Sequence, residues 1–130
     1  MLLDNGANAD IKDNNGYTAL IEATENDNKD IVKLLLDHGV DANSQDNAGY
    51  NALIHASSQG YDGIIKILLE YKVDLDIQSS SGQTAVDMAL ICDNDEVAEL
   101  ILSRGANPNI QDHNGDTALI RADVNSRNEL

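Results

Sequence analysis

The sequence has no tryptophan and no phenylalanine, and four tyrosines are its only members of the Phe, Trp and Tyr group. Aliphatic side chains and alanines must therefore fill the core, because hydrophobic residues still make up 42% of the 130 positions. That proportion is ordinary for a soluble folded domain and excludes a disordered chain. A chain of this length is expected to form one domain with a modest core.

Cysteine and long apolar runs are also scarce. Cys92 is the single cysteine, so no disulfide can form within the chain, which fits a reducing compartment. No apolar run approaches the roughly 18 residues of a membrane-spanning helix. Residues 1–6 lack the basic start and apolar middle of a secretory signal. We therefore expect a cytoplasmic protein.

Positive charge is in short supply as well. The 8 lysines and arginines are outnumbered by 23 aspartates and glutamates, which gives a formal net charge of -15. Such a field repels the phosphates of nucleic acids and anionic lipid surfaces, so neither is expected as a partner. It attracts a protein with a basic surface, although the same charge can serve only to keep a small domain soluble.

What the sequence does contain is a repeat of 33 residues, and residues of several classes follow it in one register. The series are Gly16, Gly49, Gly82 and Gly115; Ala19, Ala52, Ala85 and Ala118; Ala23, Ala56, Ala89 and Ala122; and the aliphatic triplets 34–36, 67–69 and 100–102. Agreement of independent residue classes on one period indicates a repeat protein.

Each unit predicts a short first helix that opens on a capping residue. Thr18 can accept hydrogen bonds from the free amides at the start of a helix over 19–25. Residues of the same capping type hold this place in the other units, at Asn51, Thr84 and Thr117. A polar break over 26–28 separates this helix from the next.

A second helix follows in each unit. Ile31, Leu34 and Leu35 have the spacing of one helical face. Glycine ends this helix in two units, at Gly39 and Gly105, where a left-handed residue is favoured. Lys72 replaces that glycine in the second unit and is expected to lower stability if it needs the same backbone angle.

A helix pair of this size cannot bury its apolar face alone, so the units must stack. Segments rich in Asp, Asn and Gly, such as 41–49, predict extended arms with tight turns between the units. The sequence thus predicts an all-α repeat solenoid of stacked helix-turn-helix units joined by β-hairpin-like loops. We divide this single domain, 1–130, into complete units 13–45, 46–78 and 79–111, with partial units 1–12 and 112–130.

The unit resembles the ankyrin repeat. The family pattern Asp-x-x-Gly-x-Thr-Pro-Leu-His-x-Ala is similar to the segment Asp13-Asn14-Asn15-Gly16-Tyr17-Thr18-Ala19-Leu20-Ile21-Glu22-Ala23, and the pattern Gly-Ala-Asn-x-Asn is similar to residues 105–109. The resemblance covers nearly the whole chain. One departure is the replacement of Thr-Pro-Leu-His by Thr-Ala-Leu-Ile, which puts in doubt the polar cross-links that the family makes through that histidine.

The resemblance implies a non-enzymatic scaffold that binds another protein through hairpin tips and the exposed, concave side of the first helices. At the tips it points to Asn14, Asn15, Tyr17, Asn47, Ala48, Tyr50, Ser80, Ser81, Gln83, His113, Asn114 and Asp116. On the first helices it points to Glu25, Asn26, Ser58, Gln59, Ile91 and Cys92.

Two pairs among these positions differ from the polar rest. Tyr17 and Tyr50 lie one repeat apart, so stacking places them side by side at about 10 Å, and tyrosine is enriched at binding hot spots. Alternatively, each ring only covers the neighbouring hairpin. Ile91 and Cys92 either extend an apolar patch on the same face or reflect a locally repacked helix.

No catalytic residue, metal ligand or cofactor site is predicted. His38, His55 and His113 occupy three different repeat positions, so stacking leaves them as isolated surface or half-buried side chains. His55 and Cys92 come from first helices of neighbouring units and could approach one another, but the repeat supplies no pocket for an enzyme.

Calcium binding is the other chemistry that the acidic turns suggest. The segment 13–16 resembles the middle of an EF-hand loop, and Glu22 falls at its twelfth position. The first ligand position is then Ile11, which offers no side-chain oxygen. The turns are better explained as repeat hairpins.

An alternative function is structural self-association. The chain starts with the closing part of one unit and stops after the opening part of another, and no polar capping unit is evident. Head-to-tail stacking would complete the missing unit and give a homo-oligomer.

Overall fold

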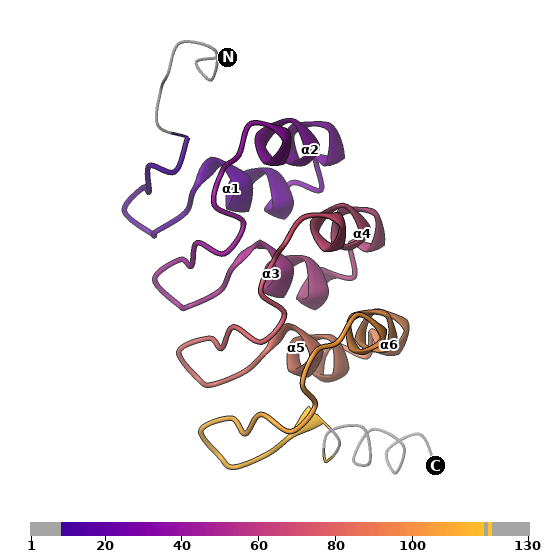
Figure 1. Ribbon diagram of the computed structural model, residues 1–130. Helices are drawn as coiled ribbons and strands as arrows, with labels where there is room; N and C mark the ends of the chain where they lie inside the picture. The colour runs from indigo at the N-terminus through magenta and orange to yellow at the C-terminus, as the bar shows by residue number, and fades with distance from the viewer. Residues whose placement is uncertain (1–8, 119, 121–130) are drawn as a thin grey trace.

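Residues 9–118 and residue 120 are described by the structure, a computed structural model in which three helix pairs stack in a row (Figure 1). The first helices of the pairs are α1 (Ala19–Glu25), α3 (Ala52–Gln59) and α5 (Ala85–Ile91), and the second helices are α2 (Lys29–Asp37), α4 (Asp62–Glu70) and α6 (Asp95–Ser103). No strand occurs in the part of the chain that the structure describes. The predicted all-α repeat solenoid is confirmed.

Each first helix begins at the residue that the sequence indicates. Thr18, Asn51 and Thr84 have extended backbones, and each side chain accepts a hydrogen bond from the amide three residues later. At Thr84 the bond is reciprocal, because Asp87 accepts from the Thr84 amide at 3.0 Å. Asp87 stands where the family pattern has histidine, so this unit uses that position for capping.

The apolar faces of the helix pairs are buried by stacking. Helices α1, α3 and α5 pack against one another in a column, and α2 packs against α4 (Figure 1). Leu53, Ile64 and Leu68 in the middle pair are 0% exposed. Burying one such side chain stabilises the fold by about 1.5–3 kcal/mol. Alanines 23, 56 and 89 are also buried, which lets the first helices approach closely.

The second helices end in two different ways. Gly39 and Gly105 have φ angles of 82° and 104° after α2 and α6, as predicted. Helix α4 ends instead at Glu70, and Tyr71 is extended with φ -104° and ψ 153°. Lys72 takes no positive φ angle. The expected stability loss at Lys72 was conditional on that angle and does not arise, because the chain leaves α4 through ordinary extended backbone.

The loops between units form tight turns that begin with an acceptor side chain. The carboxylate of Asp46 accepts hydrogen bonds from the amides of Ala48 and Tyr50, at 2.9 and 3.0 Å. Asp13 and Asp112 do the same in their own turns, and Ser79 does so through its hydroxyl. These are the Asx and Ser/Thr turns that such residues favour, and they explain the acidic turns without a metal ion.

Glycine completes each turn in the left-handed conformation. Gly16, Gly49, Gly82 and Gly115 have φ angles between 79° and 82°. The 33-residue glycine series therefore marks one recurring backbone setting.

Polar side chains tie each loop to the next one. Gln45 donates from Nε2 to the carbonyl of Gly49 in its own loop and to that of Gln78 in the next, at 2.7 and 3.1 Å. Gln78 makes the equivalent pair of bonds to Gly82 and Gln111. The polar cross-links that the missing histidine put in doubt are thus made elsewhere, by glutamines one repeat apart.

The expectations for the two partial terminal units concern residues that lie mostly outside the described ones. The incomplete helices proposed from the sequence fall on residues 1–8, 119 and 121–130, which the structure does not describe. Head-to-tail stacking therefore stays a hypothesis from the sequence. Within the described residues, no helix is long and apolar enough to cross a membrane.

Two glycines of the turn series allow a matched test of the close approach between loops. An alanine Cβ at Gly49 would lie 2.7 Å from the backbone nitrogen of Ser80, whereas one at Gly115 meets nothing within 4 Å. Both positions have φ of +80°, so both substitutions carry the same left-handed strain. We expect Gly115→Ala to lower the free energy of unfolding by about 1 kcal/mol and Gly49→Ala by roughly 2–4 kcal/mol, measured by urea denaturation. Equal losses for the two variants would contradict this interpretation.

Candidate interaction surface

One side of the stack carries the four turns and the exposed sides of the first helices (Figure 1). We call this the interaction face: the hairpin tips 13–17, 46–50, 79–83 and 112–116, together with the exposed residues of α1, α3 and α5. Helices α2, α4 and α6 lie on the opposite side of the column (Figure 1). All positions that the ankyrin resemblance implies for binding belong to this face or to the residues that end its helices.

The tips form a continuous backbone ladder. The amide of Asn47 donates to the carbonyl of Asn15, Ser80 donates to Ala48, and His113 donates to Ser81, at 2.9–3.0 Å. The side chain of Asn47 adds a bond to the carbonyl of Asn14 at 2.9 Å. Neighbouring tips are therefore held at a fixed spacing.

None of the predicted site residues is fully buried, but they divide into two groups. The exposed ones are Asn14, Asn15, Asn26, Asn47, Ala48, Gln59, Ser80, Ser81, Ile91, Cys92, His113 and Asn114, and the half-buried ones are Tyr17, Glu25, Tyr50, Ser58, Gln83 and Asp116. The tyrosines lie among the half-buried residues, so part of each ring packs against the protein itself.

A histidine ring lies in contact with both tyrosines. The centroid of His55 is 5.6 Å from that of Tyr17 and 5.3 Å from that of Tyr50, and both contacts are edge-to-face. Such arrangements are favourable for aromatic rings. Tyr17 and Tyr50 therefore belong to one aromatic cluster across the junction of the first two units.

The same histidine is bound by two carboxylates. Its Nδ1 lies 2.6 Å from Oε1 of Glu25, and its Nε2 lies 2.7 Å from Oδ2 of Asp46. His55 is only 7% exposed. The expectation that His55 is an isolated side chain is wrong, because stacking brings Glu25 of α1 to one nitrogen and Asp46 reaches the other from the turn of the same unit. Both nitrogens donate together only when the imidazole carries two protons.

The surroundings of Tyr17 favour its neutral phenol. Partial burial raises the pKa of Tyr17 above its usual value of 10.0, and the carboxylates of Glu25, Asp46, Glu22 and Asp13 raise it further. On the other side of the stack, a hydrogen bond from its hydroxyl to Asp37 raises the pKa of Tyr71.

The third unit gives the interaction face an apolar end. Ile91 closes α5 with 44% of its surface exposed, and Cys92 is also exposed. Leu90 next to them is buried in the core. The helix thus keeps its register, and Ile91 and Cys92 face solvent rather than repacking inward.

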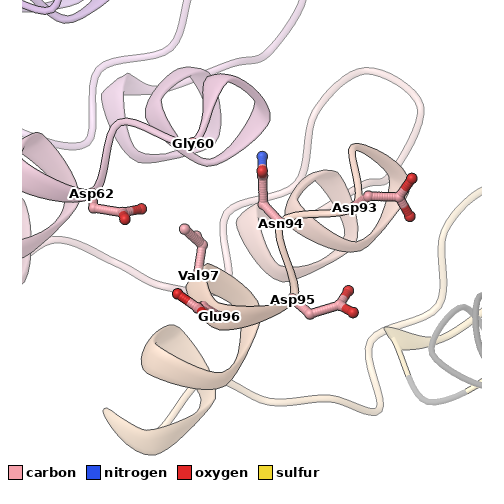
Figure 2. Close-up of a pocket in the computed structure, with 7 residues that line it drawn as sticks. All are labelled: Gly60, Asp62, Asp93, Asn94, Asp95, Glu96 and Val97. Atoms are coloured by element: carbon pink, nitrogen blue, oxygen red, sulfur yellow. The ribbon is translucent and has the colours of Figure 1, made fainter.

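A shallow hollow of about 340 Å³ lies between the α3–α4 turn and the α5–α6 turn (Figure 2). Its lining residues are Gly60, Asp62, Asp93, Asn94, Asp95, Glu96 and Val97. The carboxylates of Asp93 and Asp95 point away from Asp62 (Figure 2). Within the described residues, no group of three or more His, Cys, Asp or Glu side chains is arranged to hold a metal ion.

The structure gives no support to a catalytic pairing of His55 with Cys92. Both ring nitrogens of His55 already contact carboxylates, so neither is directed at a thiol. Sequence reasoning treated His55 separately and missed Asp46 as its partner. The repeat period was the available signal for Glu25 only, because residue 55 has the repeat position of residue 22, one helical turn before Glu25.

Comparisons with known proteins agree with this architecture. A family model described as ankyrin repeats in three copies matches residues 1–79 and, in a second placement, residues 40–112. A search of curated proteins finds no match to the chain.

The raised pKa values of Tyr17 and Tyr71 predict a loss of stability in alkali. A raised pKa means that folding favours the neutral phenol, so this contribution is complete below pH 10, where the unfolded tyrosine ionises, and is lost as pH rises through the higher folded value. Tyr17→Phe and Tyr71→Phe should each flatten the fall in unfolding free energy above pH 10. Ultraviolet titration should show in each variant the loss of one tyrosine ionisation that occurs above pH 10 in the parent protein. A component ionising below that pH would contradict the assignment.

Proposed function

The chain belongs to the ankyrin-repeat family, whose repeats are generally protein–protein interaction modules, and from this premise we propose that it binds a partner protein through the interaction face. The observation that supports this most directly is the Tyr17–His55–Tyr50 cluster at the edge of a row of fixed tips. Tyrosine gives a large contact area at a small loss of side-chain entropy, and both tyrosines here are only half-buried.

The charge distribution favours a partner with a basic surface. The tips and the first helices contain no lysine or arginine. Their acidic residues with exposed surface are Asp13, Glu22, Glu25 and Asp116, while Asp46, Asp87 and Asp112 are buried. The described lysines and arginines lie elsewhere, at Lys12, Lys29, Lys33, Lys66, Lys72 and Arg104. A face with one sign of charge steers a complementary partner toward itself.

The face also changes character along its length. Its first two units present tyrosines and carboxylates, and its third unit presents the exposed Ile91 and Cys92. A segment with basic residues near the tyrosines and an apolar residue near Ile91 fits this order. The proposed role is that of a scaffold rather than an enzyme. Both nitrogens of the buried histidine are bound, and in the hollow between the two helix turns the carboxylates of Asp93 and Asp95 point away from Asp62 (Figure 2).

Peptides selected from a random display library on the purified protein test this surface. We expect basic sequences to be enriched and Tyr17→Ala combined with Tyr50→Ala to weaken the selected peptide at least about tenfold, as for hot-spot residues. Tyr71→Ala is the matched control, since it removes a tyrosine bonded to Asp37 of α2, away from the face, and should leave affinity unchanged. Equal affinity in the double variant would exclude the tyrosines as the contact.

The charge argument makes a separate prediction about rates. Raising the salt concentration from about 50 mM to about 500 mM shortens the screening length severalfold and should slow association of the selected peptide roughly tenfold. The dissociation rate should change much less, because steering acts before contact. Surface plasmon resonance at a series of salt concentrations measures both rates. An association rate that is independent of salt would count against a basic partner.

A further inference from the structure

We propose that His55 is the positioning residue of the interaction face: bound between Glu25 and Asp46, it fixes the rings of Tyr17 and Tyr50 before a partner arrives. This inference rests on the proposed function and adds to it the residue that organises the contact. It also predicts a partner that uses the junction of the first and second units, because the cluster lies there.

The orientation of the His55 ring is determined from two sides. Glu25 lies at the end of α1 in the first unit, and Asp46 opens the second turn, so the two carboxylates approach from different elements. Bonds of 2.6 and 2.7 Å at opposite nitrogens leave the imidazole no alternative rotation that keeps both. The ring is nearly inaccessible to solvent, so water cannot replace either carboxylate at low cost.

Each tyrosine is then held at two points. The amide of Tyr50 donates to Oδ1 of Asp46, while Oδ2 of the same carboxylate contacts His55. The amide of Tyr17 donates to Asp13. With their backbones fixed in the turns and their rings against His55, both phenols lose side-chain freedom before binding. A partner then meets a preorganised pair and loses less entropy on binding.

The neighbouring units lack this arrangement. The equivalent of His55 is Glu22 in the first unit and Met88 in the third. Met88 is half-buried on α5, so it offers a control at the same repeat position without two carboxylates.

The test uses three variants and separates stability from positioning. His55→Ala leaves Glu25 and Asp46 facing each other without the imidazole, so it should lower the unfolding midpoint. Adding Glu25→Gln removes that repulsion and should restore much of the midpoint, but it cannot restore the ring contact. Met88→Ala controls for truncation of a first-helix side chain.

The readout is the order of the tyrosine rings, measured by carbon-13 relaxation on tyrosine-labelled protein well below each unfolding midpoint. The absence of tryptophan and phenylalanine leaves this aromatic spectrum simple. We expect Tyr17 and Tyr50 to become mobile in His55→Ala and to stay mobile in the Glu25→Gln double variant, with Tyr61 and Tyr71 unchanged. Met88→Ala should leave all four rings ordered.

Affinity for the peptide selected on the parent protein gives the second readout. Both His55 variants should bind the peptide about tenfold more weakly, in line with the loss of order in two side chains. Met88→Ala should bind it no more weakly than the parent does, because the tyrosine contact is intact. Ordered tyrosines in His55→Ala, or full recovery of affinity together with stability in the double variant, would overturn the positioning role.

These outcomes are distinct from a failure of the proposed function. If Tyr17→Ala with Tyr50→Ala leaves peptide affinity unchanged, the tyrosine contact itself is wrong, and the positioning proposal falls with it. If that double variant weakens binding while His55→Ala does not, the contact stands and only the role of His55 is overturned.

Discussion

The stacking of units that cannot stand alone is the constraint on which this structure depends. Each helix pair has an apolar face that only a neighbouring pair can cover, and the middle pair accordingly contains residues such as Leu53 and Leu68 with no exposed surface. Alanine at the contact positions of the first helices sets a short distance between pairs. The loops must then approach equally closely, which is why the turn glycines have no room for a side chain at Gly16, Gly49 and Gly82.

The polar groups of the loops make that close approach favourable. Backbone bonds join each tip to the next, and Gln45 and Gln78 bridge the arms from one unit to another. The histidine of the family pattern is replaced by isoleucine in the first two units, and both of these side chains are buried in the core. This chain therefore combines apolar packing inside the column with polar links in its loops, and the loops become as regular as the helices.

A rigid row of loops explains why one junction can acquire a specialised role. The His55 cluster draws on α1, the first turn, the second turn and α3, all of which stacking holds at fixed positions. Fixed backbones allow a few side chains to be placed accurately, and accurate placement lowers the entropy lost on binding. The same repeat position carries a glutamate or a methionine in the neighbouring units, so the scaffold is common to all units and the surface differs between them.

The sequence alone determined the features that recur with its period. The capping residues at Thr18, Asn51 and Thr84, the left-handed glycines and the helix pairs depend on local conformation and on a burial need that every unit shares, so they could be predicted from single residues. The tertiary structure decided what depends on neighbours. His55 contacts Glu25 because stacking brings residues 30 positions apart together, whereas Asp46, nine positions away, reaches it from the turn of the same unit. Lys72 avoids strain because α4 ends through Tyr71. Periodicity specifies which residues face the next unit, but the distances between side chains arise only once the units have packed.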